Sequence, residues 1–258
     1  MDKPTFFDFA AEVGLTKHFG GVAATRQLAE MCHIHQDSYV LDVGCGAGTT
    51  AAFLARQYGC RVAGVDIRER MVDRAQETAQ RLGVQGLVEF RVADVQSLPF
   101  VEGMFDAVLS ESVTSFPADK ALAVREYARV VKKGGYVGMG EATWLKTPPP
   151  PELLAWVRQD VGATVEPLTA EAWVGLLREA GLPLVARHVR EVQPAQEARG
   201  LTKRYGRAAL VRSILRAARL YVRSPEYRAF VRSVREGGVL PAGLQEYFGY
   251  GLYVGRKE

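Results

Sequence analysis

The chain has 258 residues, of which 48% are hydrophobic and 24% are charged, a composition that predicts one large α/β domain with an insertion. Its first residues carry neither a basic region nor an apolar run, and no segment approaches the roughly 18 apolar residues of a membrane-spanning helix, so we expect a cytoplasmic protein. The three cysteines are isolated, which excludes a disulfide framework and paired zinc ligands.

The segment at residues 15–22 precedes a helix predicted at residues 23–31 and contains one histidine, His18. Two interpretations of this side chain are open. Either His18 lies over a ligand site and accepts a proton at neutral pH, or it is a surface histidine in a capped loop. His33 and His35 point to opposite sides of an extended chain, and the sequence supplies no further ligands, so we expect no metal site there.

The first predicted strand runs straight into a glycine-rich loop in the sequence VLDVGCGAGTT. Gly44, Gly46 and Gly48 stand at alternate positions before a helix predicted at residues 51–58. Glycines permit the positive φ of a tight turn and the close approach of a ligand, and the start of a helix presents unpaired N–H groups. The loop therefore predicts a nucleotide site. A dinucleotide-binding G-x-G-x-x-G pattern would need its third glycine at Thr49.

The second predicted strand, residues 61–66, ends in Asp66. An acidic residue roughly twenty positions after such glycines can accept two hydrogen bonds from a ribose diol. The alternative is that Asp66 is the N-cap of the helix predicted at residues 68–82, since Asp is a favoured cap. The spacing from the glycines favours the ribose interpretation.

Strands and helices alternate five times at short spacing in the first part of the chain, with three further strands predicted at residues 88–93, 105–110 and 136–141. This is the pattern of a doubly wound parallel sheet, whose ligand site lies at the carboxyl ends of the strands where strand order reverses. Asp94 and Glu111 follow the third and fourth strands, as Asp66 ends the second. We therefore expect the three carboxylates at one edge of the sheet.

The chain resembles the small-molecule branch of the class I S-adenosylmethionine-dependent methyltransferases, the methyltransferase type 11-like enzymes. The likeness lies in the ordered motifs VLDVGCGAGTT, VAGVDIRERM, VEFRVADVQSLPF, FDAVLSESVTSF and REYARVVKKGGYVGMGE, and in a last helix and two closing strands at residues 172–192 and 248–256. It implies a Rossmann-like seven-stranded mixed sheet with an antiparallel last strand and a helical cap insertion. No N-P-P-Y-type tetrapeptide follows the fourth strand, which disfavours nucleobase or amide methylation.

The resemblance also implies a role for each residue of the expected cofactor site. S-adenosylmethionine is expected as the cofactor, with S-adenosylhomocysteine as its product and no metal. His18 and Glu111 are the catalytic candidates. The implied cofactor-binding residues are Asp42, Gly44, Cys45, Gly46 and Gly48 for the methionine part, Asp66 for the ribose, Ile67, Met71, Asp94 and Val95 for the adenine, and Ser110 and Glu111 beneath the sulfonium.

A single domain in five segments is expected. These are N-terminal lid helices at residues 1–36, a cofactor-binding core at 37–141, an acceptor-side segment with a helix and the sixth strand at 142–198, a basic helical cap at 199–246, and the last strand at 247–258.

Positive charge is concentrated in the cap. Although the net charge is only +4, residues 199–236 carry eleven Lys or Arg against two Glu, on two amphipathic helices predicted at residues 206–223 and from Ser224 onward. Three interpretations are open: a lid with arginines in water, contact with an anionic membrane, or a nucleic-acid patch. The lid is favoured because amphipathic helices usually bury their apolar face against their own domain, and membrane contact can accompany it. Nucleic acid is disfavoured because no RNA-binding module is present.

The sequence thus predicts a cytoplasmic enzyme, with peripheral membrane contact as an option, that moves a methyl group to a small-molecule or lipid-like acceptor by direct displacement. The protein would contribute alignment of the reacting atoms and exclusion of water, and a base is optional for a neutral amine. Two alternatives remain: an NAD-dependent Rossmann oxidoreductase, and a non-enzymatic membrane- or nucleic-acid-associated binding protein. The acceptor, the methylated atom and the oligomeric state are left open.

Overall fold

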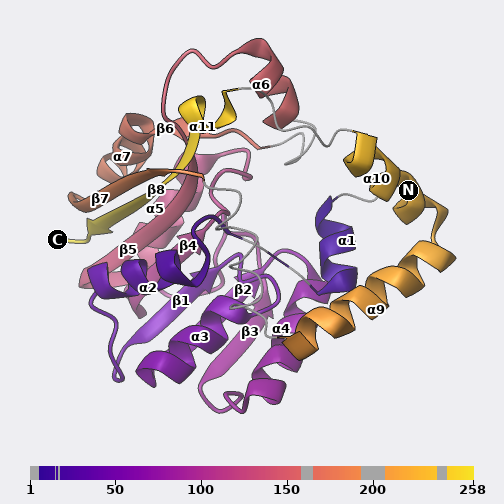
Figure 1. The fold of residues 1–258 in the computed structure, drawn as a ribbon. Coiled ribbons are helices and arrows are strands. Elements are labelled where there is room, and N and C mark those ends of the chain that lie inside the picture. Colours follow the sequence, from indigo (N-terminus) through magenta and orange to yellow (C-terminus); the bar gives the residue numbers. More distant parts are fainter. Residues whose placement is uncertain (1–5, 15, 17, 158–164, 193–206, 237–242) are drawn as a thin grey trace.

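The computed structural model describes the chain except for residues 1–5, 15, 17, 158–164, 193–206 and 237–242. One sheet lies between helices, and two further helices stand to one side of it (Figure 1). The strands are β1 (Tyr39–Val43), β2 (Arg61–Asp66), β3 (Val88–Val92), β4 (Phe105–Glu111), β5 (Val131–Trp144), β6 (Leu168–Thr169), β7 (Leu184–Glu191) and β8 (Phe248–Arg256). The helices are α1 (Phe6–Val13), α2 (Gly21–Met31), α3 (Thr49–Tyr58), α4 (Glu69–Leu82), α5 (Lys120–Val130), α6 (Pro151–Trp156), α7 (Ala170–Glu179), α9 (Arg207–Arg223), α10 (Pro225–Glu236) and α11 (Leu244–Tyr247).

The strand order is β3-β2-β1-β4-β5-β8-β7, and the two-residue strand β6 pairs with the end of β5. Strands β1 to β5 run parallel, whereas β8 lies antiparallel to both β5 and β7. This confirms the predicted doubly wound mixed sheet with an antiparallel last strand, to which β6 is a short addition. Strand order reverses between β1 and β4, so a ligand site is expected at their carboxyl ends.

Different helices cover the two faces of the sheet because successive side chains of a strand point to opposite sides. Val40 of β1 joins the apolar cluster that includes Leu28 of α2. The next residue, Leu41, joins the cluster that includes Tyr127 of α5 and Trp173 of α7. Both clusters are fully buried at these residues, so the core fixes the sheet against helices on each side.

The fifth strand is longer than the sequence predicted. β5 begins at Val131, which pairs with Phe105 before a register shift, rather than at Tyr136. At its other end β5 continues to Trp144, because the antiparallel strand β8 pairs with it up to Phe248. The segment expected to begin at residue 142 on the acceptor side therefore starts inside the sheet.

The helices α9 and α10 lie beside α1, and α9 also approaches α4 (Figure 1). Phe230 of α10 stacks on Phe9 of α1 with ring centroids 4.8 Å apart, and Arg216 of α9 forms an ion pair with Glu77 of α4 at 3.2 Å. The expected inward apolar face is confirmed for α10. For α9 it is wrong, because Ile214 is 65% exposed whereas Ser213 is buried.

No helix in the part of the chain that the structure describes is both long and apolar enough to cross a membrane.

Candidate functional site

The glycine loop follows the carboxyl end of β1 and adopts the conformation that its glycines predict. Gly44, Gly46 and Gly48 have φ angles of +63°, +51° and +72°, a region that side chains disfavour. Gly48 is the N-cap of α3. A Cβ placed on Gly44 would lie 2.3 Å from a methyl group of Val113, so this position also requires glycine for space. The loop is a close-fitting cradle of backbone groups at the start of a helix.

Asp66 ends β2 beside this cradle and is almost fully buried. Its carboxylate accepts the backbone N–H of Gly46 and the backbone N–H of Arg68, each at 3.0 Å. Burial raises the pKa of Asp66, and the two N–H donors oppose that rise. The N-cap alternative is wrong, because the N-cap of α4 is Arg68 and its side chain makes no cap hydrogen bond.

The remaining predicted residues of the adenine side lie after β2 and β3. Ile67 is 61% exposed, whereas Met71 is buried against Ala10 and Ala11 of α1. Asp94 accepts the backbone N–H of Gln96 at 2.8 Å, which fixes the turn after β3. Val95, the next residue, is buried. On the methionine side Asp42 and Cys45 are also buried, and burial raises the pKa of the Cys45 thiol well above its usual value.

Glu111 ends β4 and is the centre of a buried hydrogen-bond network. The Thr25 hydroxyl of α2 lies 3.0 Å from both carboxylate oxygens of Glu111. The hydroxyl of Thr50, in the first turn of α3, donates to Oε2 at 3.0 Å. Glu111 therefore ties the N-terminal helix α2 to the helix that begins at the glycine loop.

His18 is part of the same network. Its ring is buried, with Nδ1 3.4 Å from Glu111 Oε1 and 3.2 Å from the carbonyl oxygen of Phe19. Its Nε2 lies 3.3 Å from the Thr25 hydroxyl. The interpretation of His18 as a surface histidine is therefore wrong, and the two predicted catalytic candidates are neighbours although they are far apart in the sequence.

The Ser110 side chain points away from Glu111 and toward a second buried carboxylate, that of Glu141, for which the sequence predicted no role. Glu141 of β5 accepts hydrogen bonds from the Ser110 hydroxyl at 3.2 Å and from the backbone N–H groups of Val113, Thr114 and Ser115 at 2.9–3.3 Å. The Ser115 hydroxyl adds a fifth at 2.9 Å. The signal in the sequence that could have identified Glu141 is a charged residue within an otherwise apolar strand. In the structure Glu141 holds the loop after β4 in place.

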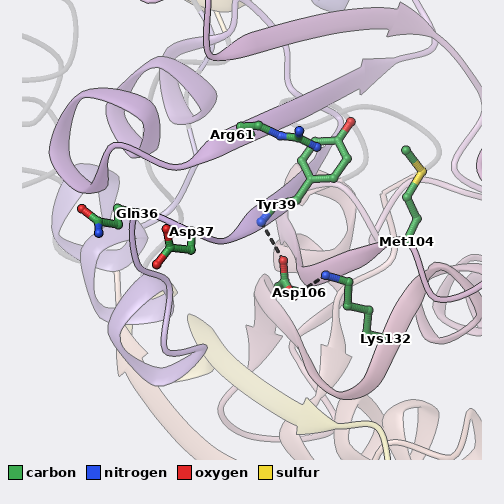
Figure 2. A pocket seen from close by; sticks show the side chains of 7 residues that line it. All are labelled: Gln36, Asp37, Tyr39, Arg61, Met104, Asp106 and Lys132. Carbon is green, nitrogen blue, oxygen red and sulfur yellow. Dashed lines mark hydrogen bonds and ion pairs between the residues drawn. The ribbon is translucent and has the colours of Figure 1, made fainter.

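A depression of about 610 Å³ lies at the opposite, amino-terminal ends of the strands (Figure 2). Its polar groups pair with one another: Asp106 accepts from Lys132 Nζ at 2.6 Å and from the backbone N–H of Tyr39 at 2.8 Å. The Arg61 guanidinium stacks over the Tyr39 ring. None of the predicted site residues lines it, and parallel α/β sheets bind ligands at their carboxyl ends. We therefore place the candidate site at the glycine loop.

Among the residues that the structure describes, no group of three or more His, Cys, Asp or Glu side chains is arranged to hold a metal ion.

A family model described as a methyltransferase domain matches residues 41–139, the segment from β1 into β5. The 27-O-demethylrifamycin SV methyltransferase of Amycolatopsis mediterranei is 30% identical over 219 residues, which cover 84% of this chain and 80% of that enzyme. The sarcosine/dimethylglycine N-methyltransferase of Halorhodospira halochloris is 38% identical over 99 residues, 38% of this chain and 36% of that enzyme.

Among solved structures, an S-adenosylmethionine-dependent methyltransferase from Geobacter sulfurreducens in complex with S-adenosylhomocysteine superposes with a TM-score of 0.73. The two chains are 20% identical, and the match covers 100% of each. The glycine cradle, with the buried carboxylate of Asp66 bonded to it, fits this cofactor. Neither an NAD-dependent oxidoreductase nor a non-enzymatic binding protein is supported. Sequence, fold and site together lead to one conclusion: the chain belongs to the class I S-adenosylmethionine-dependent methyltransferases.

Proposed function

We propose that the protein methylates a small-molecule or lipid-like acceptor, and that it does so in the cytoplasm. The acceptor class is supported by relatives named for sarcosine and dimethylglycine and for a demethylrifamycin. S-adenosylmethionine supplies a methyl group for direct displacement. The main support is the buried hydrogen bond from the Gly46 backbone N–H to the Asp66 carboxylate. It holds the glycine loop and an acidic side chain together at the carboxyl ends of the strands, where a nucleotide binds in this type of sheet.

In this proposal the residues predicted from the sequence hold the cofactor. The backbone of the glycine loop, beside Asp42 and Cys45, takes the methionine part. Asp66 accepts from the ribose with the lone pairs that Gly46 and Arg68 leave available. The exposed side chain of Ile67 becomes covered by the adenine. Met71, Asp94 and Val95 would complete the adenine side. Ser110 and Glu111 would line the floor beneath the sulfonium, Ser110 through its backbone because its hydroxyl is held by Glu141.

Replacing Asp66 with alanine is expected to weaken S-adenosylhomocysteine binding by about tenfold or more, since charge-assisted hydrogen bonds to the ribose are lost. Isothermal titration calorimetry measures the change. The matched control is Asp37→Ala, which removes an exposed carboxylate near the amino-terminal ends of the strands. Unchanged affinity in the Asp66 variant would remove Asp66 from the cofactor site.

The network around His18 can take up the proton that an acceptor releases. Nδ1 faces two acceptors, the Phe19 carbonyl and Glu111, and is therefore assigned as the hydrogen donor. The Thr25 hydroxyl can then donate either to Nε2 or to Glu111. The proton released by the acceptor would pass to the Thr25 oxygen while the Thr25 hydroxyl proton moves to Nε2. Nε2 would then be the donor, and the new Thr25 hydroxyl proton would turn to Glu111. We propose His18 as the base and Glu111 as the group that orients it.

Replacing His18 with glutamine is expected to lower the rate of methyl transfer to a hydroxyl acceptor by roughly 10²–10⁴, the usual contribution of a general base. S-adenosylhomocysteine affinity should stay within about twofold of the unaltered protein, because the cofactor does not depend on this proton transfer. The matched control is His188→Gln, an exposed histidine on β7. Equal rates for the His18 variant and the unaltered protein would show that no base acts at this position.

The helical cap and the N-terminal segment are proposed to close over the acceptor. His18 and Phe19 precede α2, and the backbone N–H of Phe19 donates to the Ser112 hydroxyl in the loop after β4 at 3.3 Å. The aromatic rings of Phe19 and of Phe248 in β8 pack in an edge-to-face arrangement, with ring centroids 5.7 Å apart. These contacts hold the N-terminal segment against the loop after β4 and against β8, and from that position it would exclude water from the acceptor.

The acceptor class is tested by incubating the protein with methyl-labelled S-adenosylmethionine and three sets of compounds: small amines, hydroxylated small molecules and lipids. We expect label to enter at least one of these sets. Transfer only to a nucleic acid or to a protein side chain would contradict the proposed acceptor class without affecting the family assignment.

A further inference from the structure

The helix α9 is amphipathic, but its apolar face points away from the protein. The face consists of Val211, Ile214, Leu215, Ala218 and Val222, whose spacing places them on one side of a helix. Val211 is 55% exposed, Ile214 65%, Leu215 64% and Val222 77%. We call these five residues the outer apolar stripe. It extends over about 16 Å at the rise of an α-helix.

The opposite side of α9 is the side that packs on the protein. It carries Ser213, which is buried, and Leu220 and Ala217, which are half-buried. Arg216 on this side reaches Glu77 of α4. The orientation of α9 is therefore set by contacts with α1 and α4, and it leaves the most apolar side chains in contact with water. Such an exposed apolar face usually marks an interaction surface.

The stripe is flanked by positive charge. Arg212, Arg219 and Arg223 are exposed along one edge of it, and α9 contains no acidic residue. Burial lowers the pKa of Arg81 of α4, and the nearby charges of Arg212 and Arg216 lower it further. The surface around the stripe thus gathers like charges, which an anionic partner would relieve.

Helix α10 contacts the C-terminal end of α9 and holds it in place. Arg228 of α10 donates to the carbonyl oxygens of Tyr221 and Val222 at 2.9 and 3.0 Å. These are carbonyls of the last turn of α9, which have no partner inside the helix. α10 is in turn stacked on α1 through Phe9. The stripe is therefore presented outward on an anchored helix.

We propose that α9 lies on an anionic membrane, with the outer apolar stripe inserted at the boundary of headgroups and acyl chains and Arg212, Arg219 and Arg223 against the headgroups. An apolar face edged by arginines is the pattern of a helix that lies in the plane of a membrane surface. Long arginine side chains keep their charge at the headgroups while their stems lie along the apolar boundary. The inference rests on the proposed function in one respect: it places the enzyme where a lipid-like acceptor is found.

A second copy of the chain fits the stripe less well than a membrane does. In a symmetric dimer the same patch meets itself, so two antiparallel copies of α9 would bring their rows of arginines to the same side of the interface. Like charges at such an interface are unfavourable, and α9 offers no carboxylate to pair with them. An anionic lipid surface matches both the apolar stripe and its positive edge.

The test is co-sedimentation of the full chain with phosphatidylcholine vesicles, with and without phosphatidylglycerol, at low and high salt. We expect binding to the anionic vesicles only, weakened by salt. The variant Arg212→Gln, Arg219→Gln, Arg223→Gln should bind about 100-fold more weakly, since each arginine near the surface is worth about 1 kcal/mol. The variant Ile214→Gln, Leu215→Gln, Val222→Gln should lose at least about tenfold, because the inserted apolar area is lost.

Two control variants carry the same kinds of substitution at exposed positions outside α9. Val101→Gln with Val185→Gln removes exposed apolar side chains elsewhere, and Arg56→Gln with Arg178→Gln removes exposed arginines elsewhere. Both should bind vesicles like the unaltered protein. The proposal is overturned if the unaltered protein binds no vesicle, if the α9 variants bind as well as it does, or if ultracentrifugation shows a dimer that the stripe variants dissociate.

Calorimetry with S-adenosylhomocysteine on the same preparations separates this proposal from the proposed function. Intact cofactor binding without vesicle binding removes only the membrane contact. Vesicle binding without cofactor binding would contradict the proposed function and leave the surface assignment of α9 standing.

Discussion

Replacing Gly46 with valine is expected to weaken S-adenosylhomocysteine binding at least about 100-fold, which is about 3 kcal/mol, while the protein stays folded. Gly46 has a φ of +51°, where a side chain costs roughly 1–2 kcal/mol. A Cβ at this position would also lie 3.0 Å from the side chain of Thr16. The loop would have to move, and the hydrogen bond from the Gly46 backbone N–H to Asp66 would be disturbed. Calorimetry measures the affinity, and circular dichroism checks the fold.

The matched control is Gly83→Val. Gly83 is the C-cap of α4 and has a φ of +70°, so valine is similarly strained there, but a Cβ would meet nothing within 4 Å. This variant should lose stability and keep its cofactor affinity. If Gly46→Val binds the cofactor as the unaltered protein does, the glycine loop is not the cradle.

Replacing Glu141 with glutamine is expected to destabilise the protein by about 2–3 kcal/mol, because a buried donor left without an acceptor costs about 1–3 kcal/mol. All five hydrogen bonds that Glu141 accepts come from N–H or O–H donors. The amide nitrogen of glutamine donates instead of accepting, so it must face backbone N–H groups wherever it is placed. Burial raises the pKa of Glu141, so loss of the charge returns part of the desolvation cost. The expected loss of about 2–3 kcal/mol already includes this gain.

Thermal unfolding should therefore shift down by roughly 5–10 °C for a chain of this size. The matched control is Glu102→Gln, a 77% exposed carboxylate whose ion-pair partner Lys257 is 3.6 Å away, and it should leave the unfolding temperature nearly unchanged. Equal unfolding temperatures for Glu141→Gln and the unaltered protein would show that the loop after β4 does not depend on this carboxylate.

The sequence was sufficient for the sheet and for the position of the site because both depend on local patterns. The short alternation of strands and helices predicted the parallel sheet, and three glycines at alternate positions predicted the loop at the end of β1, where all three adopt a positive φ. The distance along the chain from the loop to Asp66 also belongs to this local information. Its hydrogen bond to Gly46 spans only twenty residues.

The sequence was not sufficient where a residue's role depends on partners far along the chain. His18 and Glu111 meet because α2, which packs on β5 and β8, brings Thr25 to the end of β4, and no local pattern encodes this packing. Four of the five hydrogen bonds to Glu141 come from the loop of irregular structure after β4. For α9, the period of the helix identified the apolar face, but the direction of that face is decided by the packing of α1 and α4.

We propose that this fold binds S-adenosylmethionine, rather than a dinucleotide, at the glycine loop. It is tested most directly by calorimetric titration of the unaltered protein with S-adenosylhomocysteine and, separately, with NAD. We expect a one-to-one S-adenosylhomocysteine complex with a Kd near the micromolar range, about 8 kcal/mol, and no measurable heat with NAD. Tighter binding of NAD, or no binding of S-adenosylhomocysteine, would contradict it.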